Sequence, residues 1–322
     1  PVATSGTFSG KLELDFGTGA AATLAAAPGT LDLSIQQIDF QLNPTAATIE
    51  PPSQPLNIST RLNVGTGDNV LIGGFIITGT DAKLVVLRAI GPSLMVSGVP
   101  GVLADPFLEL HDSTGAIVAT NDNWMDNSTA DQMVLTENNL APTNNLESAL
   151  VETLNPGEYT AIVRGVGDTT GVALVEAYDL DNGTTNSVLG NISTRGSVET
   201  ANNVMIGGFI LGGGGGGFST VILRGIGPSL ASTGVPNVLA NPFLELHDSN
   251  GDVIDSNDNW MDNPNMQQIS DAGLAPSDPN ESALYEILPA GEYTAILSGV
   301  GATTGVGLVE TYNIDNSPVS GR

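Results

Sequence analysis

The chain has 322 residues, with 8 Lys and Arg against 35 Asp and Glu, a formal net charge of -27 at pH 7, and no cysteine. A field of this sign repels polyanions, so it argues against nucleic acid or anionic membrane as partners. Without cysteine the chain forms neither disulfides nor zinc–thiolate sites, and no apolar stretch is long enough to predict a membrane span.

The remaining composition favours a β-rich, soluble protein. The chain contains 40 Gly and 19 Pro, only 5% aromatic residues and only 13% charged residues. Low charge content argues against a charge-driven disordered polymer, and abundant turn formers are typical of many short strands joined by turns. With no redox-sensitive thiol, this composition suits an extracellular or cell-surface location.

Residues 1–55 form an N-terminal arm in which apolar and polar residues alternate over 8–16 and again over 31–42. This period of two predicts strands with one buried face. So few strands cannot enclose a core, so we expect them to pack on a module of the same chain or of a neighbour. The apolar positions of the arm strands are Phe8, Leu12, Leu14, Phe16, Leu31, Leu33, Ile35, Ile38, Phe40 and Leu42.

After the arm, the sequence repeats itself. Asn57–Arg61 returns as Asn191–Arg195, and Arg88–Leu94 returns as Arg224–Leu230 with one change. About two-thirds of the aligned positions are identical at a period of roughly 134 residues, which is the size of a whole domain. We therefore predict two homologous modules, residues 56–185 and 186–322.

Each module reads as a series of short strands separated by Gly, Pro, Asn or Asp. This pattern predicts an all-β fold: two tandem antiparallel β-sandwich domains of jelly-roll or immunoglobulin-like type. The helical period is weak, and only residues 131–138 favour a short helix. The strands expected in the first module are Val70–Ile77, Lys83–Ile90, Phe107–His111, Ala116–Thr120, Ala149–Leu154, Tyr159–Val163 and Val172–Tyr178.

The densest polar cluster is the motif Asn-Asp-Asn-Trp-Met-Asp-Asn, present once in each module. Closely spaced oxygen ligands in a turn could bind Ca²⁺, although the spacing of an EF-hand is absent. Alternatively, the Asn and Asp side chains cap their own turn. Glu147 and Glu281 either complete such a site or begin the next strand. The candidate metal ligands are Asn121, Asp122, Asn123, Asp126, Asp255, Asn257, Asp258, Asn259 and Asp262.

Trp124 and Trp260 lie inside this motif. They are candidate glycan contacts, because an exposed indole can stack on a sugar, or they plug the edge of a sandwich. Five Asn-x-Ser/Thr sequons could carry glycans in a secreted protein, namely Asn57, Asn127, Asn182, Asn191 and Asn280.

No catalytic set emerges from the titratable residues. His111 and His247 each precede an Asp on a strand, and adjacent strand residues point to opposite faces, so we interpret them as structural. Arg88 and Arg224 end apolar strands, and we expect each to form a structural ion pair with a carboxylate such as Glu109 or Glu245. Lys83 has no counterpart in the second module, so a Lys–Asn isopeptide cross-link repeated in both modules is excluded.

The run Leu108–Asn123, followed by Leu154–Val163 and Gly171–Glu176, has the order strand, Asp-x-x-Gly turn, strand, Asn-Asp, Pro-Gly-x-Tyr strand. In this order the two modules resemble tandem β-sandwich modules of secreted proteins of environmental bacteria, and more distantly bacterial pre-peptidase C-terminal domains. The resemblance does not include the arm. It implies an accessory, adhesive or assembly role and no catalytic residues.

Two functional hypotheses follow, and neither is an enzyme. In the first, the chain is a structural subunit of an extracellular filament or surface assembly that polymerises head to tail by donating its arm strands. In the alternative, it is a secreted carbohydrate-binding or adhesive β-sandwich module, for which the sequence leaves a dependence on Ca²⁺ open. A hydrolase would need two carboxylates flanking one cleft, and the sequence nominates no such pair.

Overall fold

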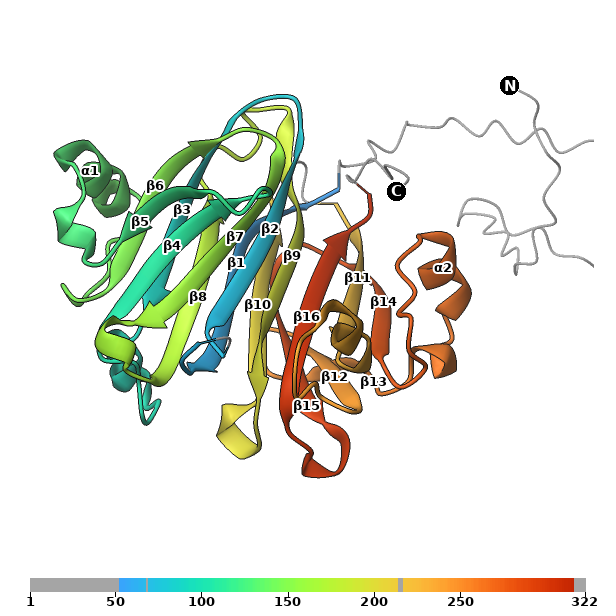
Figure 1. The fold of residues 1–322 in the computed structure, drawn as a ribbon. Helices are drawn as coiled ribbons and strands as arrows, with labels where there is room; N and C mark the ends of the chain where they lie inside the picture. The colour runs from blue at the N-terminus through green and yellow to red at the C-terminus, as the bar shows by residue number, and fades with distance from the viewer. Residues whose placement is uncertain (1–51, 68, 214–216, 316–322) are drawn as a thin grey trace, which may run out of the picture. The chain divides into compact units, whose positions relative to one another are not determined.

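A computed structural model describes residues 52–67, 69–213 and 217–315 of the chain (Figure 1). The two predicted arm strands therefore lie outside the described residues. The described part is nearly all β, as predicted. It consists of two eight-stranded antiparallel sheets packed face to face. None of the helices within these ranges is long and apolar enough to cross a membrane.

The predicted strands of the first module are confirmed, and an additional strand precedes them. Their bounds are β1 Gln54–Val64, β2 Leu71–Gly79, β3 Lys83–Ile90, β4 Pro106–Asp112, β5 Ile117–Asn121, β6 Ser148–Leu154, β7 Gly157–Gly165 and β8 Gly171–Asp179. The short helix α1, Thr129–Glu137, lies between β5 and β6, and Ser128 caps its N-terminus by accepting a hydrogen bond from the Asp131 amide.

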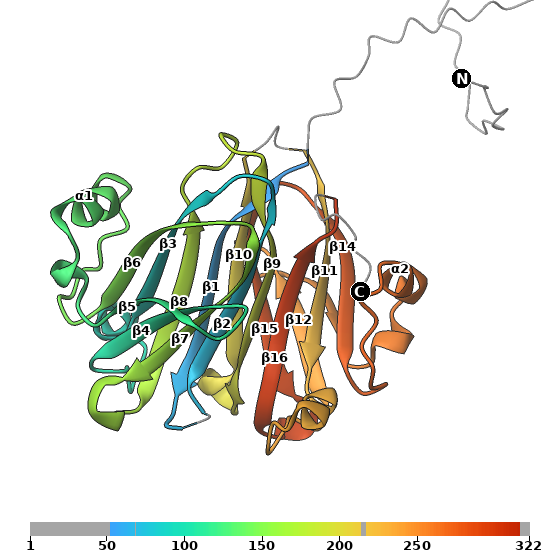
Figure 2. The same cartoon turned by 45° about the horizontal axis from the view of Figure 1, so that its top comes forward.

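The second module repeats the same order of elements. Its strands are β9 Ser187–Val198, β10 Met205–Gly212, β11 Ser219–Ile226, β12 Pro242–His247, β13 Val253–Asn257, β14 Ser282–Leu288, β15 Gly291–Gly299 and β16 Gly305–Asn313. Helix α2, Met266–Asp271, corresponds to α1, and the two helices lie at opposite ends of the sandwich (Figures 1 and 2).

The two modules are fused along one side. One sheet has the order β13-β12-β15-β10-β1-β8-β3-β6 and the other β14-β11-β16-β9-β2-β7-β4-β5. Each module thus supplies four neighbouring strands to each sheet, and the sheets continue through the antiparallel pairs β1–β10 and β2–β9. We call these two pairs the seam. The described part is therefore one continuous double sheet made of two sandwich halves.

The two modules are related by an approximate two-fold axis that passes through the seam. Exchanging each strand with its counterpart in the other module converts the order of one sheet into the reverse of the other. Equivalent residues consequently meet at the seam. The buried side chains of Thr60 and Thr194 form a hydrogen bond between their hydroxyl groups, with the two oxygens 2.7 Å apart. The contact has the form found in a symmetric dimer, here made within one chain.

One pair of equivalent residues at the seam cannot be identical. Leu62 occupies the core, and its counterpart is Gly196. A Cβ at Gly196 would come within 1.8 Å of Leu62 Cδ2. Close packing leaves room for one large side chain at this place, so one module supplies the leucine and the other supplies the space.

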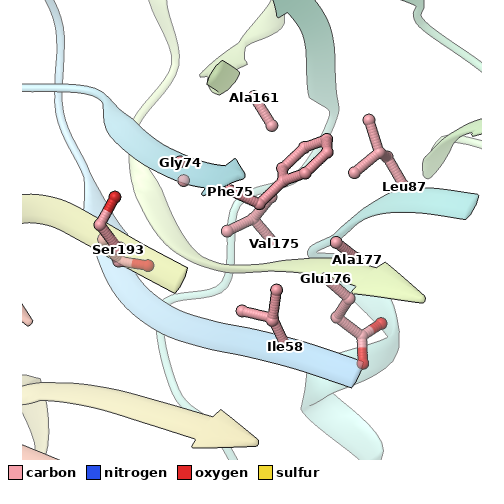
Figure 3. Close-up of a pocket in the computed structure, with 11 residues that line it drawn as sticks. Ile58, Gly74, Phe75, Leu87, Ala161, Val175, Glu176, Ala177 and Ser193 are labelled. Carbon is pink, nitrogen blue, oxygen red and sulfur yellow. The ribbon is translucent and has the colours of Figure 1, made fainter. Parts of the chain in front are cut away.

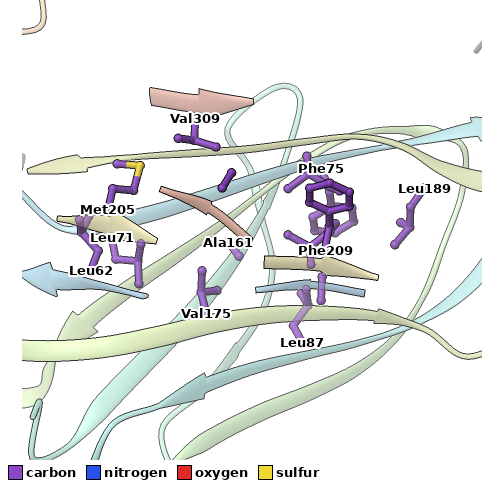
Figure 4. Close-up of a cluster of buried hydrophobic side chains, with 14 of the residues drawn as sticks. Leu62, Leu71, Phe75, Leu87, Ala161, Val175, Leu189, Met205, Phe209 and Val309 are labelled. Atoms are coloured by element: carbon purple, nitrogen blue, oxygen red, sulfur yellow. The ribbon is translucent and has the colours of Figure 1, made fainter. Parts of the chain in front are cut away.

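A single main core runs through both modules between the sheets. It includes Leu62, Leu71 and Phe75 from the first module, with Met205 and Phe209 from the second (Figure 4). Smaller clusters lie beneath the helices, where α1 buries Leu135 against Val86 and Ala149. Because apolar burial across the seam is continuous, we expect the two modules to stabilise each other.

Candidate functional site

The repeated Asn-rich motif closes a free sheet edge. Strand β6 is the last strand of its sheet, and Asn121 Oδ1 accepts a hydrogen bond from the Ala149 amide at 2.9 Å. Asn127 Nδ2 donates to the Ala149 carbonyl at 2.8 Å. Two side-chain amides thereby replace the strand that would otherwise pair here. We call this arrangement the Asn clamp.

The second module has the same clamp on its edge strand β14. Asn257 Oδ1 accepts from the Ala283 amide at 3.1 Å, and Asn263 Nδ2 donates to the Ala283 carbonyl at 3.0 Å. These asparagines also cap their own turn, as one of the two sequence-based alternatives predicted: Asn121 and Asn257 each donate to the backbone carbonyl two residues later, at 3.0 and 2.9 Å. The bonds to the backbone of the following strand are a further use that the sequence did not indicate.

The acidic members of the predicted metal site form no cluster of their own. No group of three or more His, Asp or Glu side chains that could hold an ion occurs within the described ranges. Asn123 Nδ2 reaches Asp126 at 3.4 Å, and Asp258 accepts from its neighbour Asn259 at 3.1 Å. Asp255 lies on β13, where its side chain adjoins that of Glu286. The residues of this motif are therefore engaged in local hydrogen bonds.

Sequence reasoning missed the neighbour of Asp122. Asp105, which precedes β4, and Asp122 each have one buried carboxylate oxygen without a hydrogen-bond partner. Burial, together with the charge of Asp122, raises the pKa of Asp105. The counterpart of Asp105 is Asn241, so the second module keeps one carboxylate and removes the other. Only the fold could show this pairing, since the two residues are far apart in sequence.

Glu147 and Glu281 lie directly before β6 and β14, at the position predicted as the start of the next strand. Glu147 is fully buried, and it accepts hydrogen bonds from the amides of Gly91 and Ser93 at 3.1 and 2.8 Å and from the Ser93 hydroxyl at 2.6 Å. These amides begin a 3₁₀ helix, Pro92–Ser97. The carboxylate thus caps the N-terminus of this helix from a distant part of the chain.

The tryptophans are packed against the core. Trp260 is 9% exposed and lies against Ile222, Ile269 and Ala283, while Trp124 packs partly buried on the equivalent cluster. The indole nitrogen of each is buried without a hydrogen-bond partner. Trp260 therefore agrees with the alternative in which the indole plugs the edge of the sandwich, and it offers no open ring face to a sugar.

Arg88 and Arg224 form the expected structural ion pairs, but with other partners. Arg88 Nη2 lies 2.5 Å from Glu176 Oε2, and Arg224 makes the same contact with Glu310. Each guanidinium also lies over the ring of Tyr178 or Tyr312, 5.1 Å from the centroid. Glu109 instead pairs with Arg164 on the neighbouring strand at 2.8 Å. The correct partner is the residue opposite Arg88 on β8, which the sequence could not identify without the strand order.

The sequons differ in accessibility. Asn57 and Asn191 are buried within strands β1 and β9, so neither amide can carry a glycan without disrupting a sheet. Asn127 donates both to the Trp124 carbonyl and to β6 in the clamp. Asn182 donates to Gln54, and Asn280 is exposed. Among these sequons, Asn280 is therefore the one with an open side chain.

The remaining sheet edges, β5 and β13, lack the clamp. Ile117 and Val118 on β5 are 59% and 41% exposed, and their counterparts on β13, Val253 and Ile254, are similarly exposed. Each strand also contains a bulge, because Val118 and Ile254 have no partner in the neighbouring strand. A bulge disfavours unspecific pairing of an edge, but the apolar surface stays accessible.

The two unclamped edges differ in charge. Asp255 pairs with the core residue Leu246, and Glu286 alternates with the core residues Leu284 and Leu288, so both face the space between the sheets. Burial and the adjacent Asp255 carboxyl raise the pKa of Glu286 to about 7. On β5 the counterpart of Asp255 is Ala119, which packs on the core. The β13 edge thus has two inward-facing carboxyls, Asp255 and Glu286, whereas the β5 edge has one, Glu152 on β6, which alternates with the core residues Leu150 and Leu154.

A small, partly open pocket lies near the seam, lined by Ile58, Phe75 and Val175 among others (Figure 3). Its volume of about 20 Å³ has room for roughly one water molecule. The histidines lie elsewhere, and His111 Nδ1 bonds to the Gly115 carbonyl of its own hairpin at 3.1 Å.

Comparisons with known proteins supply no family. No family model matches the chain, and no curated protein matches it. The chain is similar to the crystal structure of a DUF4785 family protein from Legionella pneumophila, with 9% sequence identity and a TM-score of 0.26. The match includes 81% of this chain and 65% of that protein, so the chain spans just under two-thirds of its length. The resemblance to pre-peptidase C-terminal domains therefore rests on the sequence motifs alone.

Proposed function

We propose that the protein is a structural subunit of an extracellular filament or surface assembly, joined head to tail by strands of its N-terminal arm. The observation that supports this proposal is the contrast between sheet edges. Asn clamps close part of β6 and β14, whereas β5 and β13 present exposed apolar residues. An added strand satisfies both an open edge and its own backbone groups.

The charge difference between the open edges favours one acceptor per subunit. An apolar strand added beside β13 would meet the inward-facing Asp255 and Glu286, and burying these carboxyls further is costly. Beside β5 it would meet Ala119 and a single carboxyl, Glu152, so the cost is lower there. One donor arm and one acceptor edge are what a head-to-tail chain needs, because a contact that does not close upon itself propagates.

Electron microscopy and light scattering of the full chain, beside a chain lacking residues 1–51, test this proposal. We expect fibres or larger particles only from the full chain. Because the chain has no cysteine, oxidation of the double variant Leu14→Cys, Val118→Cys then tests the acceptor edge. Covalent oligomers are expected from it, and none from a control with Leu14→Cys and Val96→Cys, since Val96 is 92% exposed but lies away from the sheet edges. Monomers at all concentrations, with and without the arm, would refute the proposal.

A further inference from the structure

Lys83 is the one lysine within the described residues, and it is completely buried. It begins β3 and shares the inward face with the core residues Val85 and Leu87. Its ammonium group lies 2.8 Å from Asp179 Oδ1, 2.6 Å from Asp181 Oδ1 and 3.4 Å from Thr185 Oγ1. Asp179 ends β8, the strand paired with β3, so the amine and carboxyl meet at the end of the core.

The two carboxyl groups beside Lys83 have different environments. The Asp179 side chain is 0% exposed, and its Oδ2 is buried without a hydrogen-bond partner. Burial raises its pKa, although the hydrogen bond from Lys83 opposes this shift. The Asp181 side chain is 19% exposed, and its Oδ2 accepts from the Leu84 amide at 2.9 Å. Burial would raise the pKa of Asp181, but its hydrogen bonds from Lys83 and Leu84 lower it on balance.

We propose that Lys83 and Asp179 join in an intramolecular isopeptide bond, with Asp181 as the group that moves the proton. In an apolar site the neutral pair of amine and carboxylic acid is favoured over two separated charges. Nζ then attacks Cγ of the Asp179 acid and forms the C–N bond. Asp181 takes one proton from the nitrogen and delivers it to the leaving hydroxyl group, so the C–O bond breaks and one water leaves.

The arrangement of the groups makes this reaction intramolecular and needs no other reactant. The amine and the acid are held in contact by two paired strands, which supplies the proximity that bimolecular amide formation lacks. The third group lies within hydrogen-bond distance of the nitrogen, as a proton carrier must. The unpartnered Oδ2 of Asp179 is the oxygen that would depart.

The second module shows which of these residues are specific to the reaction. Asp315, the counterpart of Asp181, also accepts from a backbone amide, that of Thr220. In place of Lys83 and Asp179, however, stand Ser219 and Asn313, and both bond to the carbonyl of Ser53. The backbone role of the outer Asp is thus shared, while the amine and the buried acid occur only in the first module.

The primary test is the intact mass of the folded full chain, measured after denaturation. We expect it to be lower than the sequence mass by one water. Trypsin should fail to cut after Lys83 and should release residues 62–88 joined to residues 165–195, which contain Asp179. An intact mass equal to the sequence mass, with cleavage after Lys83, would overturn the proposal and leave a buried ion pair.

Variants separate the roles of the three residues. Lys83→Arg keeps the charge but cannot form the bond, so it should show the full sequence mass. Asp181→Asn should lose the cross-link although Lys83 and Asp179 remain, whereas its matched control, Asp315→Asn, should retain it. Retention of the water loss in Asp181→Asn at the same rate would refute the role of Asp181. The wild-type mass decides the proposal even if a variant fails to fold.

Discussion

The two modules keep the same strands and the same hydrogen bonds to the backbone, yet they bury different charges. The first module places Lys83 with Asp179, and Asp105 beside Asp122. The second module has the neutral residues Ser219, Asn313 and Asn241 in place of Lys83, Asp179 and Asp105. In the second module the side chain of Asp255 lies against that of Glu286, whereas the first module has Ala119 in place of Asp255.

This contrast separates what the fold requires from what one module alone uses. The Asn clamp, the buried Glu before each edge strand and the Arg–Glu–Tyr group occur in both modules. They satisfy backbone groups that every copy of the fold must bury. The charges found in one module have no such task, so they are the residues on which specific functions can rest.

The largest effect is expected where the modules agree. Replacing Glu147 by Ala leaves the buried amides of Gly91 and Ser93 without an acceptor. The free energy of unfolding should fall by about 4 kcal/mol. Urea denaturation measures this loss, and Glu281→Ala should cost about as much, since Gly227 and Ser229 make the same bonds. A large inequality would show that the modules contribute differently to stability.

The next effect tests the seam. Gly196→Leu places a second leucine against Leu62 and should lower the free energy of unfolding by about 3 kcal/mol through overpacking. Exchanging the two residues, as Leu62→Gly with Gly196→Leu, should recover most of this loss in the same denaturation assay. Failure of the exchange to recover stability would contradict the two-fold character of the seam.

A smaller effect depends on pH. The pKa of Glu286 is about 7 in the fold, compared with an ordinary value of 4.5, so the folded state holds this proton more tightly. Stability should therefore fall as pH rises from about 4.5 through 7. Glu286→Gln should raise the free energy of unfolding by about 1 kcal/mol at pH 8, after allowance for solvent screening, with no gain at pH 4.

The matched control is Glu152→Gln in the first module. Burial and the charge of Asp131 raise the pKa of Glu152 as well, but no carboxyl stands at Ala119. Its gain at pH 8 should be smaller than that of Glu286→Gln. Equal gains would show that burial, and not Asp255, governs both carboxyls.

The smallest effect copies the second module into the first. Asp105→Asn removes one carboxylate from the pair with Asp122, as Asn241 does naturally. Because the pKa of Asp105 is raised, its ionised form is disfavoured in the fold, and the variant should gain about 0.5 kcal/mol at pH 7 after solvent screening. The gain should vanish below pH 4, where the acid is protonated in both states. A loss at pH 7 would show that the carboxylate has a partner it needs.

The sequence predicted most strands of the first module because their apolar residues alternate. It missed β1, where Asn57 and Thr60 are buried beside Ile58 and Leu62, so polar and apolar positions do not separate by face. Such burial of polar residues arises from the seam. Pairing between modules is a contact between distant segments, and a repeat alone does not reveal whether its copies stand apart or share sheets.

The candidate sites likewise depend on contacts between segments that are distant in the sequence. The Asn motif stood out in the sequence, but its use depends on the free edge of β6, which only the strand order reveals. Arg88 was expected to pair, yet its partner Glu176 lies on a strand that is adjacent only in space. The absence of a Lys83 counterpart excluded a cross-link in both modules, while the fold was needed to place Asp179 beside it.

The seam has a consequence for how the protein is made. Strands β1 and β2 are complete early in synthesis, but their partners β10 and β9 lie more than a hundred residues later. At about 5–20 residues per second, the first module waits several seconds with two open edges. During this time its natural partner is absent, and the same edge of another nascent chain could pair with it. We therefore expect the yield of correctly folded protein to depend on chaperones and on the spacing of ribosomes, and not only on the stability of the finished fold.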